Sequence, residues 1–377
     1  MSTERRVKKR KTAHAGSLNG AAKLAPRFTP VPGGREWTVS IALPGSVLSN
    51  LPTAEQRLTT VARIARSLAI FSVDEVVVYN DAPGASSSTL TRLDAPQQPH
   101  AYTADSDPCH FLAQLLSFLE CPPFMRRMLF PLHPNLKHTS ILPQVDMPHH
   151  PNPKDPWIPY CEGVTVAAPP PPPATPKAGS AASAAGGGGG GRGGGGALVD
   201  TGFDEPPVQV DQAIPPNTRV TLRYASPDSE RPECVHPDAP RQEGGYYWGY
   251  TVRQAASLSG VFTECPYDGG YDVSIGTSER GTPVAQAIPP PGNGSHHHAA
   301  AMPAFRHLLV VFGGPRGVEF AAANDAGLSG MGIKGAKTRE LFDHWVNVLP
   351  NQASRTIFTD EAIPIAMMAL RGLVGEA

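Results

Sequence analysis

Two apolar segments on either side of a helical pattern constrain the fold of this chain most. Residues 36–43 (EWTVSIAL) and 74–81 (DEVVVYND) have the length and composition of strands, and the second contains a continuous apolar run typical of a strand buried on both faces. Between them, Thr53 and Gln56 have capping-box spacing, and apolar residues recur at helical intervals from Leu58 to Ala69. The order strand, helix, strand predicts a right-handed βαβ unit with two parallel strands, which begins an α/β sheet.

Later segments predict that this α/β domain is discontinuous. Residues 108–132 favour two short helices broken at Pro122 and Pro123, residues 307–314 (HLLVVFGG) a second buried strand, and residues 359–373 a last helix. From about residue 157, short β-like pieces (EGVTV, ALVDTG, VQVD and TRVTLRYA) alternate with Pro and Gly. We therefore expect a first α/β part at residues 35–156, a small inserted β-barrel at 157–245, and a second α/β part at 246–377.

Low-complexity segments interrupt this plan. Residues 167–197 join a proline run to a glycine run that contains Arg192, and we expect a disordered loop with at most weak RNA contact. His296, His297 and His298 stand in a second Pro/Gly-rich segment, where adjacent histidines lack the preorganised geometry of a metal site. No metal site is predicted from these histidines.

Charge is balanced over the chain but concentrated near its start. Lys and Arg total 32 against 33 Asp and Glu, which excludes a uniformly basic nucleic-acid binder. Residues 1–34 are predicted to be a disordered arm. Its six clustered cations indicate a nuclear or nucleolar targeting signal that also contacts RNA phosphates, or else a solvated tail: Arg5, Arg6, Lys8, Lys9, Arg10 and Lys11.

Cysteine usage and hydropathy indicate in which cellular compartment the protein works. The five cysteines are widely spaced without a C-x-x-C pair, which argues against a disulfide framework or a zinc site: Cys109, Cys121, Cys161, Cys234 and Cys265. No apolar stretch approaches about 20 residues, so no membrane partner is expected. We expect a soluble intracellular protein.

Two loops carry the candidate binding residues. The strand at residues 307–314 continues into Gly313, Gly314 and Gly317, which suit either a ligand loop or a tight turn. The stretch WVNVLPNQASRTIFTDEAI at residues 345–363 places many polar residues between two apolar elements. A helix N-cap formed by Ser354, Thr356 or Thr359 explains one hydroxyl but not the polarity of the whole loop.

Six segments together resemble a known family: TVSIALPGSVL, RSLAIFSVDEVVVYND, DPCHFLAQLLSFLECPPFMRRMLFP, YWGYTVRQAASLSGVFTECPYDGGYDVSIGTSERG, FGGPRGVE and SRTIFTDEAI. They are similar to the SPOUT-class RNA methyltransferases that carry an inserted OB-like barrel, over most of residues 36–373. The resemblance implies an α/β domain with a C-terminal trefoil knot, S-adenosylmethionine as cofactor, and association as a homodimer or as a heterodimer with a SPOUT paralogue. It also implies ribosomal RNA in pre-ribosomal particles as the partner and a nuclear, nucleolar location.

The resemblance assigns site residues as well. The adenine of the cofactor would be held by backbone groups near Val348, Leu349 and Pro350. Side chains or further backbone groups would come from Asn347, Ser354, Arg355 and Thr356, with Gly313 and Gly314 in the facing loop. Arg280 is the candidate to contact the substrate base, its phosphate or the cofactor carboxylate, and pairing with Glu279 or Glu319 is the alternative.

The chain departs from the family pattern in the same loop. Many members carry P-G-Q-G-S-R-T where this sequence has PNQASRT, with Asn351 and Ala353 in place of glycine. Asn tolerates a positive φ, whereas Ala does so much less readily. We therefore expect a SPOUT-fold, RNA-associated protein of large-subunit biogenesis with reduced or lost methyltransferase activity, and an active S-adenosylmethionine-dependent rRNA methyltransferase is the alternative.

RNA contact and association complete the expectations. Arg219, Arg223 and Tyr224 of the inserted barrel are candidates for RNA binding, with Arg126 and Arg127 as flanking phosphate contacts. The last helix is apolar on more than one face, which predicts a dimer interface or burial within the monomer: Ile363, Ile365, Met367, Met368 and Leu370.

Overall fold

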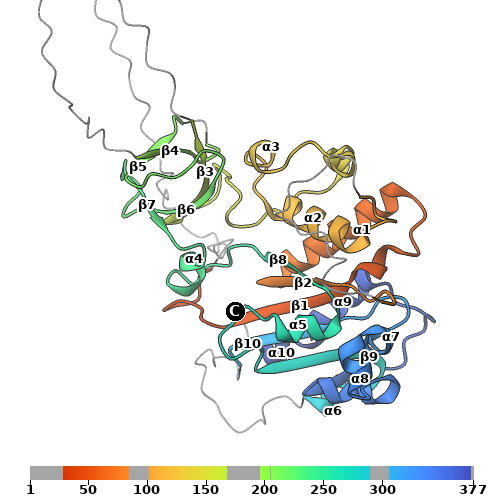
Figure 1. The fold of residues 1–377 in the computed structure, drawn as a ribbon. Helices are drawn as coiled ribbons and strands as arrows, with labels where there is room; N and C mark the ends of the chain where they lie inside the picture. Colours follow the sequence, from red (N-terminus) through yellow and green to blue (C-terminus); the bar gives the residue numbers. More distant parts are fainter. Residues whose placement is uncertain (1–28, 85–101, 168–195, 204, 289–304, 375–377) are drawn as a thin grey trace, which may run out of the picture.

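A parallel sheet and a separate antiparallel sheet form the framework of the protein (Figure 1). The computed structural model describes residues 29–84, 102–167, 196–203, 205–288 and 305–374. The six-stranded parallel sheet has the order β11-β9-β10-β1-β2-β8. Its strands are β1 (Thr38–Pro44), β2 (Glu75–Tyr79), β8 (Thr251–Ala255), β9 (Val273–Pro283), β10 (His307–Val311) and β11 (His344–Asn347). The predicted α/β class is confirmed.

The βαβ unit forms as the sequence predicts. β1 and β2 pair in parallel, with Ser40 opposite Glu75, and α1 (Ala54–Ile70) connects them. The Thr53 hydroxyl accepts from the amide of Gln56 over 3.2 Å, and Gln56 Oε1 accepts from the amide of Thr53 over 3.2 Å. Both strands are buried along their whole length, as expected for strands covered on two faces.

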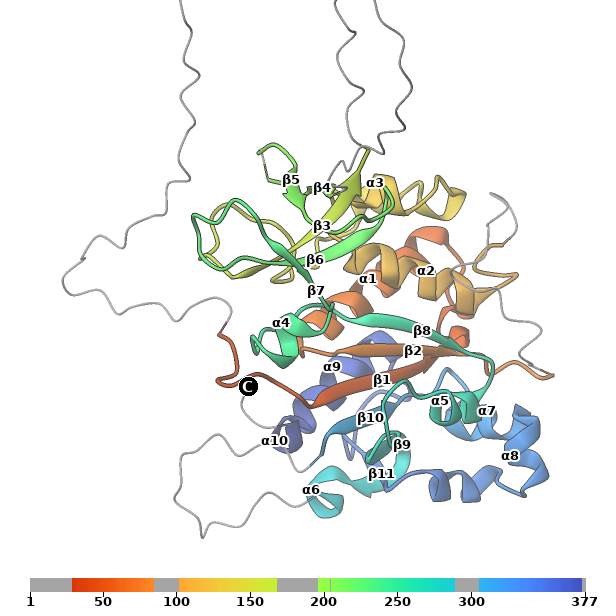
Figure 2. The same ribbon diagram turned by 60° about the vertical axis from the view of Figure 1, so that its left-hand side comes forward.

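Helices cover both faces of the parallel sheet (Figure 2). On one face, α1, α2 (Pro108–Glu120) and α9 (Thr359–Ala369) pack against strand residues that include Ile41, Val78 and Val310. On the other face, α5 (Leu258–Thr263), α7 (Val318–Asn324) and α8 (Ala326–Gly330) pack against Ala42, Val77 and Val311. Shorter helices complete the layers: η1 (Gly45–Leu48), α3 (Arg126–Leu129), η3 (Pro134–Leu136), η4 (Thr139–Ile141), α4 (Ala239–Gln242), α6 (Val284–Ala287), η5 (Gly335–Leu341) and α10 (Arg371–Val374).

The second sheet is antiparallel and lies between β2 and β8 in the sequence. It has the order β5-β4-β3-β6-β7, built from β3 (Tyr160–Val166), β4 (Ala197–Asp200), β5 (Val208–Val210), β6 (Arg219–Arg223) and β7 (Glu233–Val235). The four predicted β-like pieces correspond to β3, β4, β5 and β6, whereas β7 was not predicted. In the described part of the chain it is a curled sheet with β5 and β7 as edge strands. We refer to it as the inserted sheet.

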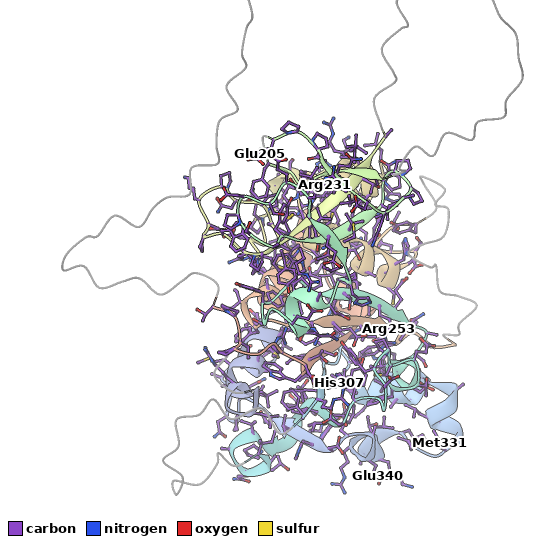
Figure 3. All side chains as sticks on the ribbon, turned by 90° about the vertical axis from the view of Figure 1, so that its left-hand side faces the viewer. Glu205, Arg231, Arg253, His307, Met331 and Glu340 are labelled. Atoms are coloured by element: carbon purple, nitrogen blue, oxygen red, sulfur yellow. The ribbon has the colours of Figure 1, made fainter. Side chains whose placement is uncertain are left out.

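The inserted sheet marks one end of the molecule (Figure 3). Glu205 and Arg231 lie at that end, and Met331 and Glu340 lie at the opposite end, beyond the parallel sheet. Three predictions fall outside the described residues: the basic run at residues 5–11, the segment with Arg192, and the histidines His296 to His298.

The connections of β1 and β10 define a topological switch point. These strands are neighbours in the sheet, with Ile41 opposite Val310. β1 continues through η1 to α1 on one face, whereas β10 continues to α7 on the other face. In open α/β sheets, ligands bind beyond the carboxyl ends of strands at such a point. The ends of β1 and β10 are therefore the place to look for a site.

Candidate functional site

A bulge in β9 shapes the first part of the candidate site. β9 pairs with β11 at Gly276 opposite Trp345, and the pairing resumes at Thr282 opposite Val346. Residues 277–281 therefore protrude from the ladder between these two pairs. Asn347 Nδ2 donates to the backbone oxygen of Glu279 over 2.8 Å and closes the bulge. Bulges often re-aim a side chain next to a functional site.

The bulge presents Arg280, the predicted catalytic residue. The side chain of Arg280 is 74% exposed, and its Nη1 lies 3.8 Å from Glu319 Oε1 on α7. This long contact at an exposed position is worth little energy. The guanidinium remains accessible to a phosphate, a base or a carboxylate, although the predicted pairing with Glu319 is also present.

Gly313 and Gly314 form a tight turn after β10. The amide of Gly317 donates to the oxygen of Gly314 over 2.9 Å, and Gly317 has φ +80°. A Cβ at Gly313 would lie 2.6 Å from the backbone of Gly317 and Val318, so the turn has no room for a side chain there. The tight-turn interpretation is confirmed, and the turn lies at the end of β10.

The polar loop at residues 348–358 joins β11 to α9, and the first residue of α9 contacts this turn. Thr359 Oγ1 donates to the backbone oxygen of Gly313 over 3.3 Å. At the other end of the loop, the amide of Leu349 donates to Asn347 Oδ1 over 3.0 Å. The structure thus brings together Arg280, the Gly313–Gly314 turn and the loop that carries Val348, Leu349, Pro350, Ser354, Arg355 and Thr356.

The polar side chains of the loop mostly form hydrogen bonds within the loop. Ser354 Oγ donates to the oxygen of Thr356 over 2.7 Å, and Gln352 Nε2 donates to the oxygen of Ser354 over 3.1 Å. The N-cap explanation is wrong, because α9 begins after Phe358, whose amide donates to Glu361 Oε2 over 3.0 Å. The hydroxyls of Ser354 and Thr359 bond to the backbone oxygens of Thr356 and Gly313 instead.

Backbone groups of the loop suit a nucleoside ligand. Within the described residues, the amides of Ala353, Ser354 and Arg355 donate to no protein acceptor. Leu349, in the same loop, is 40% exposed and offers an apolar surface. Free amides next to an apolar side chain can hold an adenine ring, so the residues fit the adenosine part of S-adenosylmethionine.

The two positions that depart from the family pattern behave differently. Asn351 has φ +62°, in the left-handed region that Asn tolerates and glycine prefers. Ala353 is not among the described residues with positive φ. The backbone at Ala353 therefore requires no glycine, and its methyl group only occupies space.

Two further residues, Ser46 and Asp81, lie at the switch point and were not predicted. Ser46 follows β1, Asp81 follows β2, and Ser46 Oγ donates to Asp81 Oδ2 over 2.5 Å. Burial raises the pKa of Asp81 above its usual range. The signal in the sequence was a polar residue two positions after the end of each of two apolar strands.

Arg126 and Arg127, the predicted flanking phosphate contacts, lie near an apolar cavity of about 490 Å³ on the outer side of α2. Arg126 donates to the backbone oxygens of Leu119 and Cys121 over 3.0 and 2.8 Å, and its guanidinium lies over the ring of Phe118. Arg126 thus holds the end of α2, whereas Arg127 is exposed.

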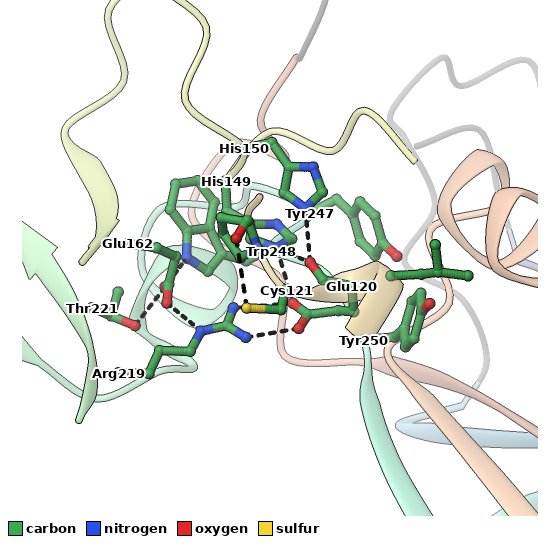
Figure 4. Close-up of polar contacts among 12 residues, drawn as sticks. Glu120, Cys121, His149, His150, Glu162, Arg219, Thr221, Tyr247, Trp248 and Tyr250 are labelled. Atoms are coloured by element: carbon green, nitrogen blue, oxygen red, sulfur yellow. Dashed lines mark hydrogen bonds and ion pairs between the residues drawn. The ribbon is translucent and has the colours of Figure 1, made fainter. Parts of the chain in front are cut away.

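Arg219 lies in a polar network between α2 and the inserted sheet (Figure 4). It contacts Glu120 and Glu162, each over 2.7 Å. Glu162 Oε1 also accepts from Thr221 and from the indole of Trp248 over 2.7 Å each. Burial opposes ionisation of Glu120, but the charges of Arg219 and His149 outweigh it and hold the pKa of Glu120 well below its usual range.

Arg223, on the same strand as Arg219, is more exposed. It pairs with Glu233 over 2.9 Å and Glu243 over 2.6 Å at the surface. Both arginines of the inserted sheet thus have carboxylate partners within the protein, which the sequence alone did not indicate.

Metal and membrane features were sought in the described residues. No group of three or more His, Cys, Asp or Glu side chains there is arranged to hold a metal ion. None of the described helices has the length and apolar character needed to cross a membrane.

The protein is a two-part α/β protein. Its parallel sheet has a switch point between β1 and β10 and a bulge in β9, and an antiparallel sheet is inserted between β2 and β8. A family model described as "Putative RNA methyltransferase" matches residues 38–370. The chain belongs to this RNA methyltransferase family.

Relatives of known activity are similar over nearly the whole chain. A 28S rRNA (uridine-N(3))-methyltransferase of Homo sapiens is 38% identical over 349 residues, which cover 90% of this chain and 80% of the relative. The protein of the same name from Mus musculus is 37% identical over 345 residues, covering 90% and 77%. That of Drosophila melanogaster is 38% identical over 348 residues, covering 89% of this chain and 62% of the longer relative.

Proposed function

We propose that this protein is an S-adenosylmethionine-dependent methyltransferase that acts on N3 of a uridine in large-subunit ribosomal RNA. The observation that carries this proposal is the meeting of the β9 bulge, the β10 turn and the β11–α9 loop at one edge of the sheet. Relatives that are 38% identical over 90% of the chain carry the name of this activity and support the choice of substrate.

The roles of the residues follow from their positions. The amides of residues 353–355 and the side chain of Leu349 would hold the adenosine, and Asn347 would fix the bulge that presents Arg280. Arg280 would contact the phosphate or base of the target nucleotide. The cofactor supplies an activated methyl group, so the protein has to align the reactants and exclude water rather than form a covalent intermediate.

A trefoil knot in the parallel sheet domain and an OB-like inserted sheet are part of the same proposal. A SPOUT trefoil knot would be formed by the segment from β9 to α9, in which Thr359 at the start of α9 contacts the β10 turn. The inserted sheet would be an OB-like module that contacts single-stranded or distorted RNA. The carboxylates that hold Arg219 are buried, whereas those that pair with Arg223 are exposed, so we assign the direct RNA contacts to Arg223, Arg127 and the basic run at residues 5–11.

Association and location are proposed on similar grounds. Leu349, Phe358 and Met368 are exposed apolar residues of the β11–α9 loop and α9. We assign this surface to dimer formation, with an identical chain or with a SPOUT paralogue. The basic run and the choice of substrate favour work on pre-ribosomal particles in the nucleus, chiefly the nucleolus.

One observation favours a second function. Ala353 places a methyl group in a loop where many family members have glycine, and in the proposed cofactor site this group would narrow the space for the ligand. An RNA-associated assembly factor of the large subunit with reduced or lost catalysis would tolerate such narrowing. Asn351 gives this alternative no support, because it adopts the left-handed backbone itself.

The test combines binding with product analysis. Calorimetry with S-adenosylhomocysteine should show one site per chain. Transfer from labelled S-adenosylmethionine to large-subunit RNA should give 3-methyluridine, detected by mass spectrometry after nuclease digestion. Arg280→Ala should lower turnover, whereas Arg339→Ala, an exposed arginine on η5, should not. Absence of cofactor binding together with normal RNA binding would favour the assembly factor.

A further inference from the structure

The Ser46–Asp81 pair lies under the turn that ends β10. A Cβ at Gly314 would lie 2.1 Å from Ser46 Oγ and 3.4 Å from Asp81 Oδ2, so the backbone of Gly314 rests directly on the pair. Asn324 of α7 donates to the backbone oxygen of Asp81 over 2.8 Å. The pair is thus fixed from both helical layers, between the ends of β1, β2 and β10.

Other carboxylates near these strand ends are engaged. Glu319 pairs with Arg280, Asp360 pairs with Arg63 over 3.4 Å, and Glu361 accepts from the amide of Phe358. Among the residues that the structure describes, no arginine or lysine forms an ion pair with Asp81. Its carboxylate receives the Ser46 hydroxyl instead and is only 5% exposed, whereas Ser46 itself is half-buried.

The groups that face Asp81 leave it as the proton acceptor of this cluster. Burial raises the pKa of Asp81, and the hydrogen bond from Ser46 and, to a smaller extent, the charge of Arg316 in the β10–α7 connection offset this only in part. Burial also raises the pKa of Tyr79 and raises that of Cys109 on α2 to about 12, so neither is ionised at neutral pH. A carboxylate with a raised pKa is better matched to a proton transfer near neutrality than an ordinary surface carboxylate.

The proposed reaction needs such an acceptor, because N3 of uridine carries a proton. We propose that Ser46 and Asp81 form a relay that removes this proton: the N3 proton passes to Ser46 Oγ while the Ser46 hydroxyl proton passes to Asp81 Oδ2. The N3 electron pair then forms the bond to the methyl carbon, and the electron pair of the broken carbon–sulfur bond stays on sulfur. This inference rests on the proposed function, and Arg280 keeps its role in placing the nucleotide.

The first test compares pH–rate profiles under single-turnover conditions. In the wild-type protein the rate should rise with pH through the titration of Asp81 and then become level. In Asp81→Asn and Ser46→Ala the rate should be about 10²- to 10⁴-fold lower near neutral pH and should keep rising with pH, because solvent must remove the proton. Binding of S-adenosylhomocysteine and of RNA, followed by calorimetry and filter binding, should be unchanged in both variants.

Asp74→Asn is the matched control. Asp74 is a buried carboxylate directly before β2, at the opposite end of the strand from Asp81, and it pairs with Arg35. Asp74→Asn should lower the stability of the protein. The folded fraction of this variant should still show a rate that becomes level at high pH, as in the wild type. If Asp81→Asn does not fold, Ser46→Ala removes the relay without introducing a new group in the core.

The second test changes the substrate. RNA with 5-fluorouridine at the target position has a more acidic N3, so it should restore much of the rate in Asp81→Asn and Ser46→Ala while changing the wild-type rate little. The relay would be overturned if 5-fluorouridine changed the rates of the wild type and the variants equally. It would also be overturned if the variants retained the wild-type pH–rate profile or lost cofactor binding. A wild-type protein that forms no 3-methyluridine would instead contradict the proposed function, which separates the two failures.

Discussion

Arg219 of β6 donates to both carboxylate oxygens of Glu120 at the end of α2, from Nη1 over 2.7 Å and from Nη2 over 3.0 Å. The same guanidinium donates from Nε to Glu162 over 2.7 Å. One arginine therefore joins the inserted sheet to the helical layer of the parallel sheet (Figure 4). The orientation of the inserted sheet relative to the parallel sheet depends on this contact.

Replacing Arg219 should destabilise the protein strongly. Arg219→Ala removes the guanidinium from two buried carboxylates, so that Glu162 loses its cation and Glu120 keeps only His149, and breaking buried ion pairs in this way costs about 3 to 5 kcal/mol. The free energy of unfolding from urea titration measures the effect. Arg223→Ala, which removes exposed pairs on the same strand, should cost about 0 to 1 kcal/mol. Equal losses for the two variants would show that the junction does not depend on the buried pairs.

This junction also shows where sequence reasoning reached its limit. Arg219 was predicted to bind RNA because it stands in a strand with Arg223 and Tyr224. Its partners Glu120 and Glu162 lie 99 and 57 residues away in the sequence, so no local pattern indicates the pairing. Residue type alone could not distinguish an arginine held by carboxylates from one free to contact phosphate.

Local signals, by contrast, predicted the core elements well. The capping box at Thr53 and Gln56 and the buried run before Asp81 act within a few residues, and both formed as expected. The β9 bulge depends on pairing with β11, which lies about 65 residues further on, and the switch point depends on which face each helix covers. These are tertiary features, and so the position of Arg280 and the Ser46–Asp81 pair emerged only from the structure.

Acid should weaken the same junction through His150. Burial and the neighbouring His149 lower the pKa of His150 to about 3 from 6.5, and its Nε2 lies 2.7 Å from the backbone oxygen of Glu120. Between these two pH values the unfolded chain binds a proton that the folded protein does not bind. Stability should therefore fall as the pH falls below about 6.5, by at most about 1.4 kcal/mol per pH unit from this residue.

Unfolding of His150→Gln, measured between about pH 7 and pH 5, tests this assignment. The variant should lose less stability over that range than the wild type, because its side chain has no proton to gain in the unfolded state. His236→Gln, at an exposed position of the inserted module, controls for removal of a histidine. If the control removes as much of the pH dependence as His150→Gln, burial of His150 is not the cause.

The dimer proposal predicts that charge on the exposed side of α9 prevents association. Ile363, Met367 and Leu370 are buried within the monomer, whereas Met368 is 62% exposed and Phe358 56% exposed. Phe358→Glu and Met368→Glu should convert the dimer to a folded monomer in sedimentation experiments. Met331→Glu changes an equally exposed methionine at the end of α8 and should leave the dimer intact. The interface would be rejected if the wild-type protein is monomeric and no paralogue is recovered with it from cells.

The basic run should contribute charge rather than base recognition. Deletion of residues 5–11 removes six cations, and each phosphate contact to single-stranded RNA contributes about 0.7 to the slope of log affinity against log salt. The deletion should therefore weaken binding of all RNA sequences similarly and flatten the slope. A deletion of equal length at residues 12–18, which removes no arginine or lysine, is the control. An unchanged slope after the first deletion would exclude phosphate contact by this segment.

The backbone of Asn351 predicts how the loop at residues 348–358 responds to substitution. Because Asn351 has φ +62°, Asn351→Ala forces a Cβ-bearing residue without a polar side chain into the left-handed region, at about 1 to 2 kcal/mol. Distortion of the loop should lower S-adenosylhomocysteine affinity up to roughly 30-fold by calorimetry, whereas Asn351→Gly should bind at least as well as the wild type. Asn217→Ala, at φ +60° in the turn before β6, should lose stability without losing cofactor affinity. Ala353→Gly distinguishes the two candidate functions. A large gain in affinity for S-adenosylhomocysteine would mean that the Ala353 methyl group narrows the pocket. An unchanged affinity would leave the assembly-factor function without its main support.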